Sequence, residues 1–452
     1  MGAPMSSAPP LTRPNLTRKA IFTQAWPIMI GQASVPLVGI VDTAVIGRTG
    51  DAAALAGVAL GATLIGLVFW SFGFLRMGMT GLTSQAQGAG QRHEVEALLL
   101  RGIAIGLALG VAIFALQVPL SRGALALMSG GETVSAEAAA YMHGRFMGAP
   151  AALTVYAITG WLFGLGRTRD ALALQLVMNA ANTAFDLWFV IGLGWGAFGV
   201  GVGTALAELV AVITGLVLVG RDGAGTVIGF VRRATRAQVL DPARLKLLFA
   251  VNRDIMIRTV ALLLLFVWFA NAGARLGAAA LAANHVLLQF ITVAACVLDA
   301  FAFTAEARVG HAVGGRSRAE FTRAIRLSGE LSLLAGALLS ALFLLAGGPV
   351  IDFLTTDPQV REIAHRFLPF AAILPLIGMP SWMLDGVFVG ATQGRAMRNA
   401  AVLATLSYIA LDLALRSEGQ FGLWIAFSAS YVLRAGALGV QLPRLVRTIG
   451  HG

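Results

Sequence analysis

The sequence predicts an all-α polytopic membrane protein with twelve transmembrane helices in two six-helix lobes. Three observations lead to this fold class. The chain of 452 residues is 57% hydrophobic and only 12% charged, with a mean hydropathy of +0.79, whereas a soluble domain carries about 25% charged residues. Apolar segments of about 20 residues, enough to cross a hydrocarbon core of about 30 Å, follow one another along the chain. The two halves of the sequence also resemble each other.

Glycines, prolines and charge clusters divide the chain into apolar segments that we interpret as spans. The predicted spans cover residues 20–47, 53–76, 96–118, 137–164, 170–193, 196–219, 246–273, 279–303, 321–346, 361–390, 397–415 and 420–443. This predicts a tail at 1–19, a first lobe at 20–220, a linker at 221–245, a second lobe at 246–443 and a tail at 444–452.

The net charge of +11 is spread over short loops rather than gathered on one face, which argues against a nucleic-acid partner. Cytoplasmic loops of membrane proteins carry an excess of Lys and Arg. Placing both termini in the cytoplasm puts most of the basic residues in cytoplasmic segments, such as 221–245. The polar N-terminus has no secretory signal pattern. We therefore expect a multi-pass membrane protein with both termini in the cytoplasm.

An internal repeat relates the two halves at an offset of 226 residues. AAALAGVALG at 52–61 aligns with AAALAANHVL at 278–287, and AFDL at 184–187 aligns with ALDL at 410–413. Each half contains an even number of predicted spans, so both halves enter the membrane from the same side. This is a parallel repeat, which relates two lobes by an axis along the membrane normal.

The sequence lacks the motifs of several other function classes. Its single cysteine, Cys296, excludes an intrachain disulfide and a cysteine-cluster metal site. Neither of its two lysines, Lys19 and Lys246, belongs to a phosphate-binding GxxxxGK[ST] loop, and no HExxH pattern occurs. We therefore expect neither an enzyme, including a polytopic membrane enzyme, nor a bound cofactor.

Four polar residues of the first half predict a cation site. Asp42 in span 1, Asp186 in span 5 and Thr204 in span 6 come to similar depths at 1.5 Å per residue, and Asn182 lies one turn below Asp186. A carboxylate within the bilayer costs about 2.5–3.5 kcal/mol on insertion scales and needs a reason. Two carboxylates, a carboxamide and a hydroxyl suit H⁺ or Na⁺, because hard cations take oxygen ligands.

The repeat provides an internal comparison for these residues. Asp42 aligns with Trp268, Asn182 with Tyr408 and Thr204 with Phe427, whereas Asp186 alone aligns with another acid, Asp412. If the polar residues served only as hydrogen bonds between helices, such an asymmetry would not be expected. The site is therefore predicted in the first half only, and Asp412 is interpreted as structural.

The remaining polar features leave alternatives open. Pro27 in span 1 removes a backbone hydrogen bond and allows either a bend that moves Asp42 or a static kink. Asp299, Glu306 and Asp385 in the second half either line a central cavity or pair with Arg258 or Arg308. No role is predicted for Glu208.

Four stretches carry a resemblance to a known family. GQASVPLVGIVDTAVIGRTGDAAALAGVALG resembles the first two helices of multidrug and toxic compound extrusion (MATE) transporters. FGFLRMGMTGLTSQAQGAG, VNRDIMIRTVALLL and LDGVFVGATQGRAMRN resemble its DNA-damage-inducible (DinF) branch, and the resemblance extends over residues 20–440. It implies a V-shaped fold of two six-helix lobes.

The resemblance also implies roles for individual residues. The family's first-lobe cation site matches Asp42, Asn182, Asp186 and Thr204, and Pro27 matches the proline that bends in some members. Another branch places a cation site in the second lobe with acids in helices 7 and 10. This chain has Asp385 in span 10 but no mid-membrane acid in span 7.

The function that the resemblance implies is antiport. We expect a monomer in the lipid bilayer of the bacterial inner membrane that exchanges H⁺ or Na⁺ for amphipathic, often cationic small molecules by alternating access. The alternative within transport is a flippase for lipid-linked precursors of the same superfamily. Such flippases usually carry extra helices and a basic cavity, for which Arg76, Arg145 and Arg258 are the candidates.

Overall fold

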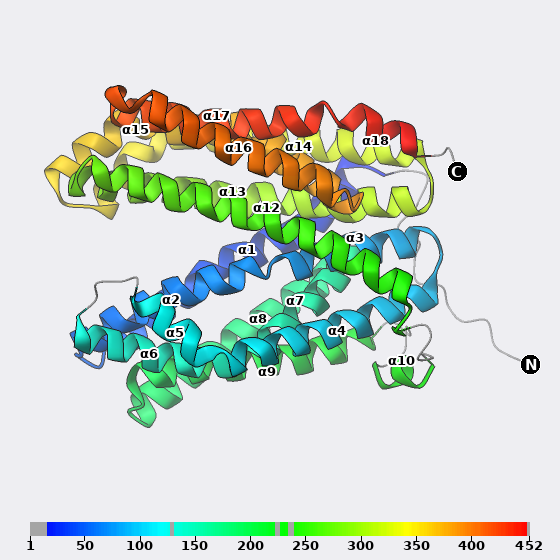
Figure 1. The fold of residues 1–452 in the computed structure, drawn as a ribbon, viewed down its shortest axis with the longest axis horizontal. Helices are drawn as coiled ribbons and strands as arrows, with labels where there is room; N and C mark the ends of the chain where they lie inside the picture. Colours follow the sequence, from blue (N-terminus) through cyan, green and yellow to red (C-terminus); the bar gives the residue numbers. More distant parts are fainter. Residues whose placement is uncertain (1–15, 127–130, 222–226, 234–238, 450–452) are drawn as a thin grey trace, which may run out of the picture. The chain divides into compact units, whose positions relative to one another are not determined.

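The computed structural model describes residues 16–126, 131–221, 227–233 and 239–449, and within these ranges the chain is helical and contains no strand. Figure 1 follows the helices from α1 to α18. The predicted all-α class is thus confirmed. Parts of the predicted tails at 1–19 and 444–452 and of the linker at 221–245 lie outside the described residues.

The helices of the first half are short or interrupted in several places. They are α1 (Arg18–Gly47), α2 (Ala52–Ser71), α3 (Phe74–Gly88), α4 (Arg92–Ala115), α5 (Gln117–Ala126), α6 (Glu132–Met147), α7 (Ala149–Gly164), α8 (Thr168–Asp186), the π-helix η1 (Leu187–Gly192), α9 (Gly196–Val219) and α10 (Val227–Arg233).

The helices of the second half are longer. They are α12 (Pro242–Arg275), α13 (Ala278–Gly314), α14 (Arg318–Leu354), α15 (Pro358–Gly390), α16 (Gly394–Ala414), the 3₁₀ helix η2 (Arg416–Glu418), α17 (Gln420–Gly439) and α18 (Leu442–Thr448). Helix α13 continues well past the predicted end at residue 303, because the polar stretch that follows, including Glu306, is buried within the fold.

Within the described parts of the chain, ten helical segments are long and apolar enough to cross a membrane, and the pair α6 and α7, bent by 53°, makes an eleventh. Each of the twelve predicted spans overlaps one or two helices. The helix at the span 397–415, α16, is not among the long apolar segments, because its apolar sequence is interrupted by Arg398, Asn399 and Asp412. The protein is therefore a multi-pass membrane protein with ten or eleven recognisable spans, and twelve remains a prediction.

The chain divides into two compact units. The first unit contains residues 30–87 and 91–247, and the second contains residues 88–90 and 248 onward. Helix α1 is shared: its residues up to Met29 belong to the second unit and those from Ile30 to the first. Hydrogen bonds fix the first part of α1 within the second unit, where Arg308 donates to Gln24 Oε1 at 2.7 Å and Arg18 pairs with Glu330 at 2.7 Å.

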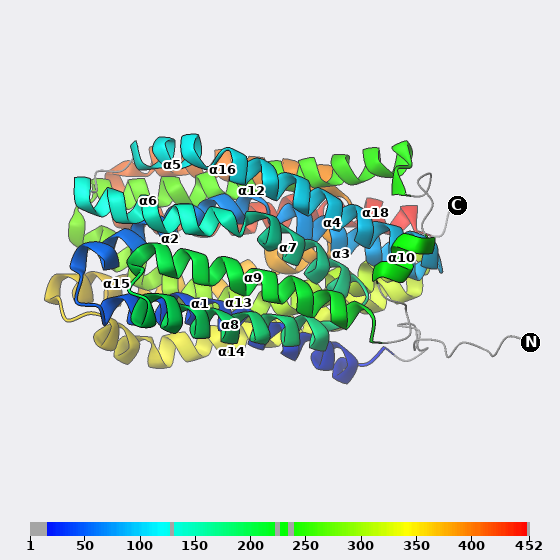
Figure 2. The ribbon, with the colours of Figure 1, turned by 90° about the horizontal axis from the view of Figure 1, so that it is seen from below.

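Close helix packing builds the first unit. Helix α8 lies along α9, as Figure 2 shows, and α6 also packs against α9. Glycines make these approaches possible: a Cβ at Gly201 of α9 would overlap the backbone of Tyr141 in α6. The α8, α9 and α6 contacts bring together the polar residues of the first half.

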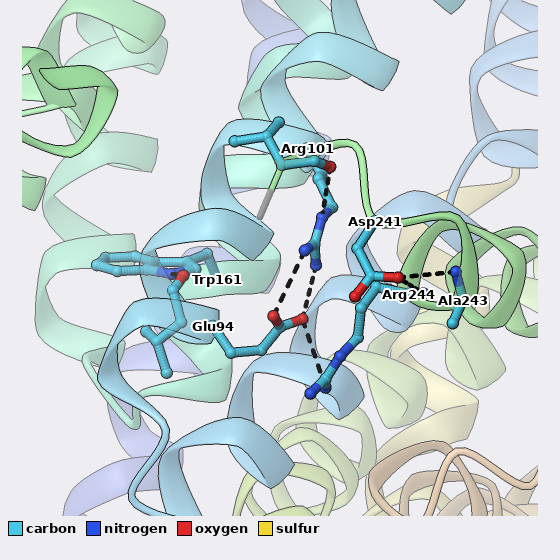
Figure 3. Close-up of polar contacts among 8 residues, drawn as sticks. Glu94, Arg101, Trp161, Asp241, Ala243 and Arg244 are labelled. Atoms are coloured by element: carbon cyan, nitrogen blue, oxygen red, sulfur yellow. Dashed lines mark hydrogen bonds and ion pairs between the residues drawn. The ribbon is translucent and has the colours of Figure 1, made fainter. Parts of the chain in front are cut away.

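An ion-pair network fixes the described end of the linker to α4 (Figure 3). Arg101, whose side chain is 1% exposed, donates to Glu94 Oε1 at 2.6 Å and from Nε to the carbonyl of Val239 at 2.9 Å. Arg244 lies 3.7 Å from the same Glu94 oxygen. Asp241 accepts hydrogen bonds from the first amides of α12, which it caps. The beginning of α12 is therefore held in the first unit.

Candidate cation site

Asp42, Asn182 and Asp186 are buried together in the first unit. Asp42 comes from the C-terminal part of α1, and the other two lie one turn apart on α8. The side chain of Asp42 lies within interaction range of both Asp186 and Asn182. The structure thus brings together the two acids that the sequence places at similar depth.

Thr204 joins the same cluster from α9. Asn182 Nδ2 donates to Thr204 Oγ1 at 3.1 Å, and that hydroxyl donates to the carbonyl of Val200 at 3.0 Å. The carboxamide is thereby oriented with its nitrogen toward α9. Its oxygen, Asn182 Oδ1, is left without a hydrogen-bond partner among the described residues.

Oxygen atoms without donors are the main chemical feature of the cluster. Asp186 Oδ1 and Oδ2, Asp42 Oδ1 and Asn182 Oδ1 are all buried, and no described residue donates a hydrogen bond of normal geometry to them. Ionised carboxylates are acceptors only. Leaving such acceptors buried and unpaired is costly. A proton or a Na⁺ ion would satisfy these oxygens, because both bind to oxygen acceptors.

Gly203 allows α9 to approach Asp186, and it is a residue that the sequence analysis missed. A Cβ at this position would overlap Asp186 Oδ1. Its position next to Thr204 was the available signal, because a glycine beside a polar residue within a helix permits close backbone approach. The tight approach contributes to the burial of the Asp186 carboxylate.

Helix geometry changes immediately after Asp186. The α-helix gives way to the π-helix η1, which ends with the Leu193 amide donating to the Trp188 carbonyl at 3.0 Å. Short π segments are rare and frequently occur at functional sites. In the second half, Asp412 is followed instead by the end of α16 at Ala414 and the 3₁₀ helix η2. The helix geometry is therefore specific to the half with the polar cluster.

A buried ion pair lies next to the cluster. Arg145 of α6 makes two contacts of 3.0 Å with Glu208 of α9, and its guanidinium lies 5.0 Å from the ring centroid of Phe69. Glu208 lies one turn beyond Thr204, on the same face of α9. Arg145 is within electrostatic range of both Asp42 and Asp186. The role of Glu208, left open by the sequence, is thus to balance the charge of Arg145.

The equivalent positions of the second half are filled with hydrogen-bonded and aromatic side chains. Asp412 accepts from Trp268 Nε1 at 2.9 Å and pairs with Arg275 at 3.0 Å. Phe427 and Tyr408 are completely buried with their rings edge to face. The Asp412 carboxylate is thus paired with donors of its own unit, which fits the structural interpretation that the repeat suggests.

Asp299, Glu306 and Asp385 belong to the second unit, whereas Asp42 belongs to the first. Asp385 of α15 forms an ion pair with Arg258 of α12, one of the two alternatives left open above. Glu306 is completely buried and Asp299 is half-buried, both on α13. Pro27 lies in α1 two residues before Met29, the last residue of this helix within the second unit.

Comparisons with known proteins identify the family and the fold of the chain. The model of the MatE family matches residues 27–188 and 255–413, one segment in each half of the chain. DNA damage-inducible protein F of Escherichia coli (strain K12) is 35% identical over 423 residues, covering 93% of this chain and 91% of that protein. Multidrug resistance protein NorM of Vibrio vulnificus (strain YJ016) is 25% identical, with 95% of each chain covered.

Solved structures share the fold. A structure described as MATE in the bent conformation has a TM-score of 0.86 at 16% identity, covering 96% of this chain and 97% of its own. One described as MATE in the straight conformation has a TM-score of 0.85 at 17% identity and the same coverage.

Proposed function

The chain belongs to the MatE family, and from this premise we propose that it is a cation-coupled antiporter that exports amphipathic, often cationic small molecules. Its relatives include proteins named for multidrug resistance, which supports drug export as the general activity. We propose the bacterial inner membrane as its location, a monomer as its working form and H⁺ or Na⁺ as its coupling ion, with no further cofactor.

The observation that carries this proposal is the set of buried oxygens without donors on Asp42, Asn182 and Asp186. These residues, with Thr204, would hold the coupling cation. Two adjacent carboxylates repel each other when both are ionised and are brought together when a cation lies between them. Cation binding would therefore draw the outer part of α1 toward α8.

The proposed movement of α1 links cation binding to transport. Pro27 has no amide hydrogen, so the helix lacks one backbone hydrogen bond there and bends more easily. We propose that cation entry from outside bends α1 and displaces the substrate outward. The lobes at 20–220 and 246–443 would then rock between inward-open and outward-open states, with both termini in the cytoplasm. Pro27→Ala should slow transport at unchanged expression, and an unchanged rate would contradict a gating role.

The test is transport by purified protein in liposomes under separately imposed pH and Na⁺ gradients, with a fluorescent cationic dye as substrate. Dye movement should follow one of the two gradients and should be abolished in Asp42→Asn and Asp186→Asn. The matched control is Asp412→Asn, which changes the equivalent acid of the second half. Dye movement when neither gradient is imposed, or full activity in Asp42→Asn, would exclude the proposed coupling.

A further inference from the structure

Two arginines and one acid lie together in the second unit, on three different helices, with side chains that are 8–15% exposed. Arg258 of α12 donates from Nη2 to Asp385 Oδ2 of α15. Arg434 of α17 places its own Nη2 3.8 Å from the same oxygen and donates to Ser381 Oγ at 2.9 Å. Two guanidinium groups therefore converge on one carboxylate oxygen. We call Arg258, Ser381, Asp385 and Arg434 the guanidinium cluster.

The guanidinium cluster has more donors than acceptors. A guanidinium carries five N–H donors. Nε of Arg258 and Nε of Arg434 are both buried and have no acceptor among the described residues. The Arg434 side chain is only 8% exposed, so water reaches little of it. A buried donor without a partner is costly, which favours the binding of an additional acceptor.

Aromatic rings lie beside the donors. The guanidinium of Arg434 lies 5.3 Å from the ring centroid of Tyr431, whose ring lies 5.0 Å from that of Trp382 at 37°. Asp299 of α13 also acts electrostatically on Tyr431. The guanidinium cluster itself contains two arginines and one acid, so it has an excess of formal positive charge as well as of hydrogen-bond donors.

The depth of the guanidinium cluster distinguishes it from a surface site. Arg258 lies 16 residues after the first residue of α12 (258 − 242) and 17 before the last (275 − 258). This places it roughly 25 Å from either end of the helix at 1.5 Å per residue. The donors therefore lie in the membrane-spanning part of the second unit, far from both ends of α12.

We infer that the guanidinium cluster binds the carboxylate or phosphate group of an aromatic amphipathic anion. Arginine donors match these planar or tetrahedral oxygen groups, and the hydrogen bonds are charge-assisted. The rings of Trp382 and Tyr431 offer an adjacent apolar surface for the aromatic part. The inference rests on the proposed export function for its biological meaning, since it adds acidic amphipaths to the substrates, but binding is measured without transport.

The experiment compares three probes with the same ring system: 1-naphthoate, 1-naphthyl phosphate and 1-naphthylmethylamine. Binding to the purified full-length protein in nanodiscs of phosphatidylcholine is measured by isothermal titration calorimetry. We expect the two anions to bind and the affinity to fall at least about tenfold in Arg434→Gln and in Arg258→Gln, because each loses charge-assisted hydrogen bonds. Amine binding should stay unchanged. Arg275→Gln, which alters an arginine paired with Asp412 in the same unit, is the control.

A third variant is expected to change the affinity in the opposite direction, which separates loss of anion binding from loss of folding. Asp385→Asn removes the carboxylate that occupies Arg258, so it should tighten the binding of both anions severalfold. Anion affinities that do not change in either arginine variant, or that fall in Asp385→Asn, would overturn the inference.

Adding phosphatidylglycerol to the nanodiscs distinguishes whether the anionic group comes from a lipid or from a free molecule. If the lipid displaces 1-naphthoate, the site binds a lipid phosphate; if 1-naphthoate stays bound, the site binds a free amphipathic anion. Both results support binding of an anionic oxygen group by the guanidinium cluster.

This test is independent of the proposed antiport. Loss of cation-coupled dye transport in wild-type liposomes would refute the proposed function and leave anion binding standing. Absence of anion binding alongside normal dye transport would refute the inference alone.

Discussion

Trp268 donates from Nε1 to Asp412 Oδ2 at 2.9 Å, and these two residues occupy the positions of Asp42 and Asp186 one repeat later. The offset is the same for both, since 268 − 42 and 412 − 186 each equal 226. The second half has replaced one carboxylate of the pair with a hydrogen-bond donor. Arg275 adds a second donor to Asp412 at 3.0 Å. One copy of the repeat therefore has an acid with two donors, and the other has buried acid oxygens without a donor among the described residues.

Asp412→Asn should therefore have little effect on transport. The carboxamide oxygen still accepts from Trp268, and only the charge attraction to Arg275 is lost. Because the Arg275 side chain is 39% exposed, that attraction is screened and contributes about 1 kcal/mol or less. We expect dye transport within about twofold of wild type, against complete loss in Asp186→Asn. Equal loss in the two variants would show that the two acids are functionally equivalent.

Gly203→Ala should inactivate the protein through the cation site. The added methyl group would overlap Asp186 Oδ1, and relief of such overpacking typically costs about 1–3 kcal/mol. The carboxylate must move away from α9, so transport should fall to background while the protein still elutes as a folded monodisperse species.

Gly66→Ala in α2 is the matched control for that substitution. A Cβ at Gly66 meets no atom within 4 Å, and alanine favours a helix by about 0.5–1 kcal/mol over glycine. The Gly66→Ala variant should keep full transport, and its apparent Tm should be slightly higher than that of the wild type. A fully active Gly203→Ala would show that the position of the Asp186 carboxylate is not critical.

The fold class and the cluster of Asp42, Asn182, Asp186 and Thr204 follow from local sequence signals. Hydropathy identifies helices, and similar depth on neighbouring helices brings polar side chains together. The features that the sequence does not predict depend on packing between residues far apart in the sequence. Arg434 lies in an apolar helix, and only its packing against α15 reveals the shared carboxylate of Asp385. The π-helix after Asp186 likewise has no composition signal, because it reflects packing rather than propensity.

The linker network offers a comparison between two arginines on the same acid. Arg101 is 1% exposed and contacts Glu94 Oε1 at 2.6 Å, whereas Arg244 is 43% exposed and lies 3.7 Å away. Removing a buried partner leaves an uncompensated charge, which costs about 3–5 kcal/mol. Arg101→Ala should lower the apparent Tm markedly. Arg244→Ala should change the stability by less than about 1 kcal/mol, and similar losses in the two variants would mean that burial does not set the contribution.

The buried pair of Arg145 and Glu208 should behave as a unit. Both side chains are about nine-tenths buried and make two contacts of 3.0 Å. Arg145→Met alone leaves the Glu208 carboxylate without its cation, and Glu208→Gln alone leaves the guanidinium without its anion, so each should destabilise the protein by about 3–5 kcal/mol.

The double variant Arg145→Met/Glu208→Gln removes both charges and should be more stable than either single variant. Its free-energy loss should fall short of the sum of the two single losses, with a coupling of about 0.5–3 kcal/mol for residues in direct contact. Denaturant-induced unfolding in detergent, followed by tryptophan fluorescence, measures all four proteins of the cycle. Additive losses would mean that the two residues contribute separately to stability, through packing against Phe69 and α9, and not through their mutual attraction.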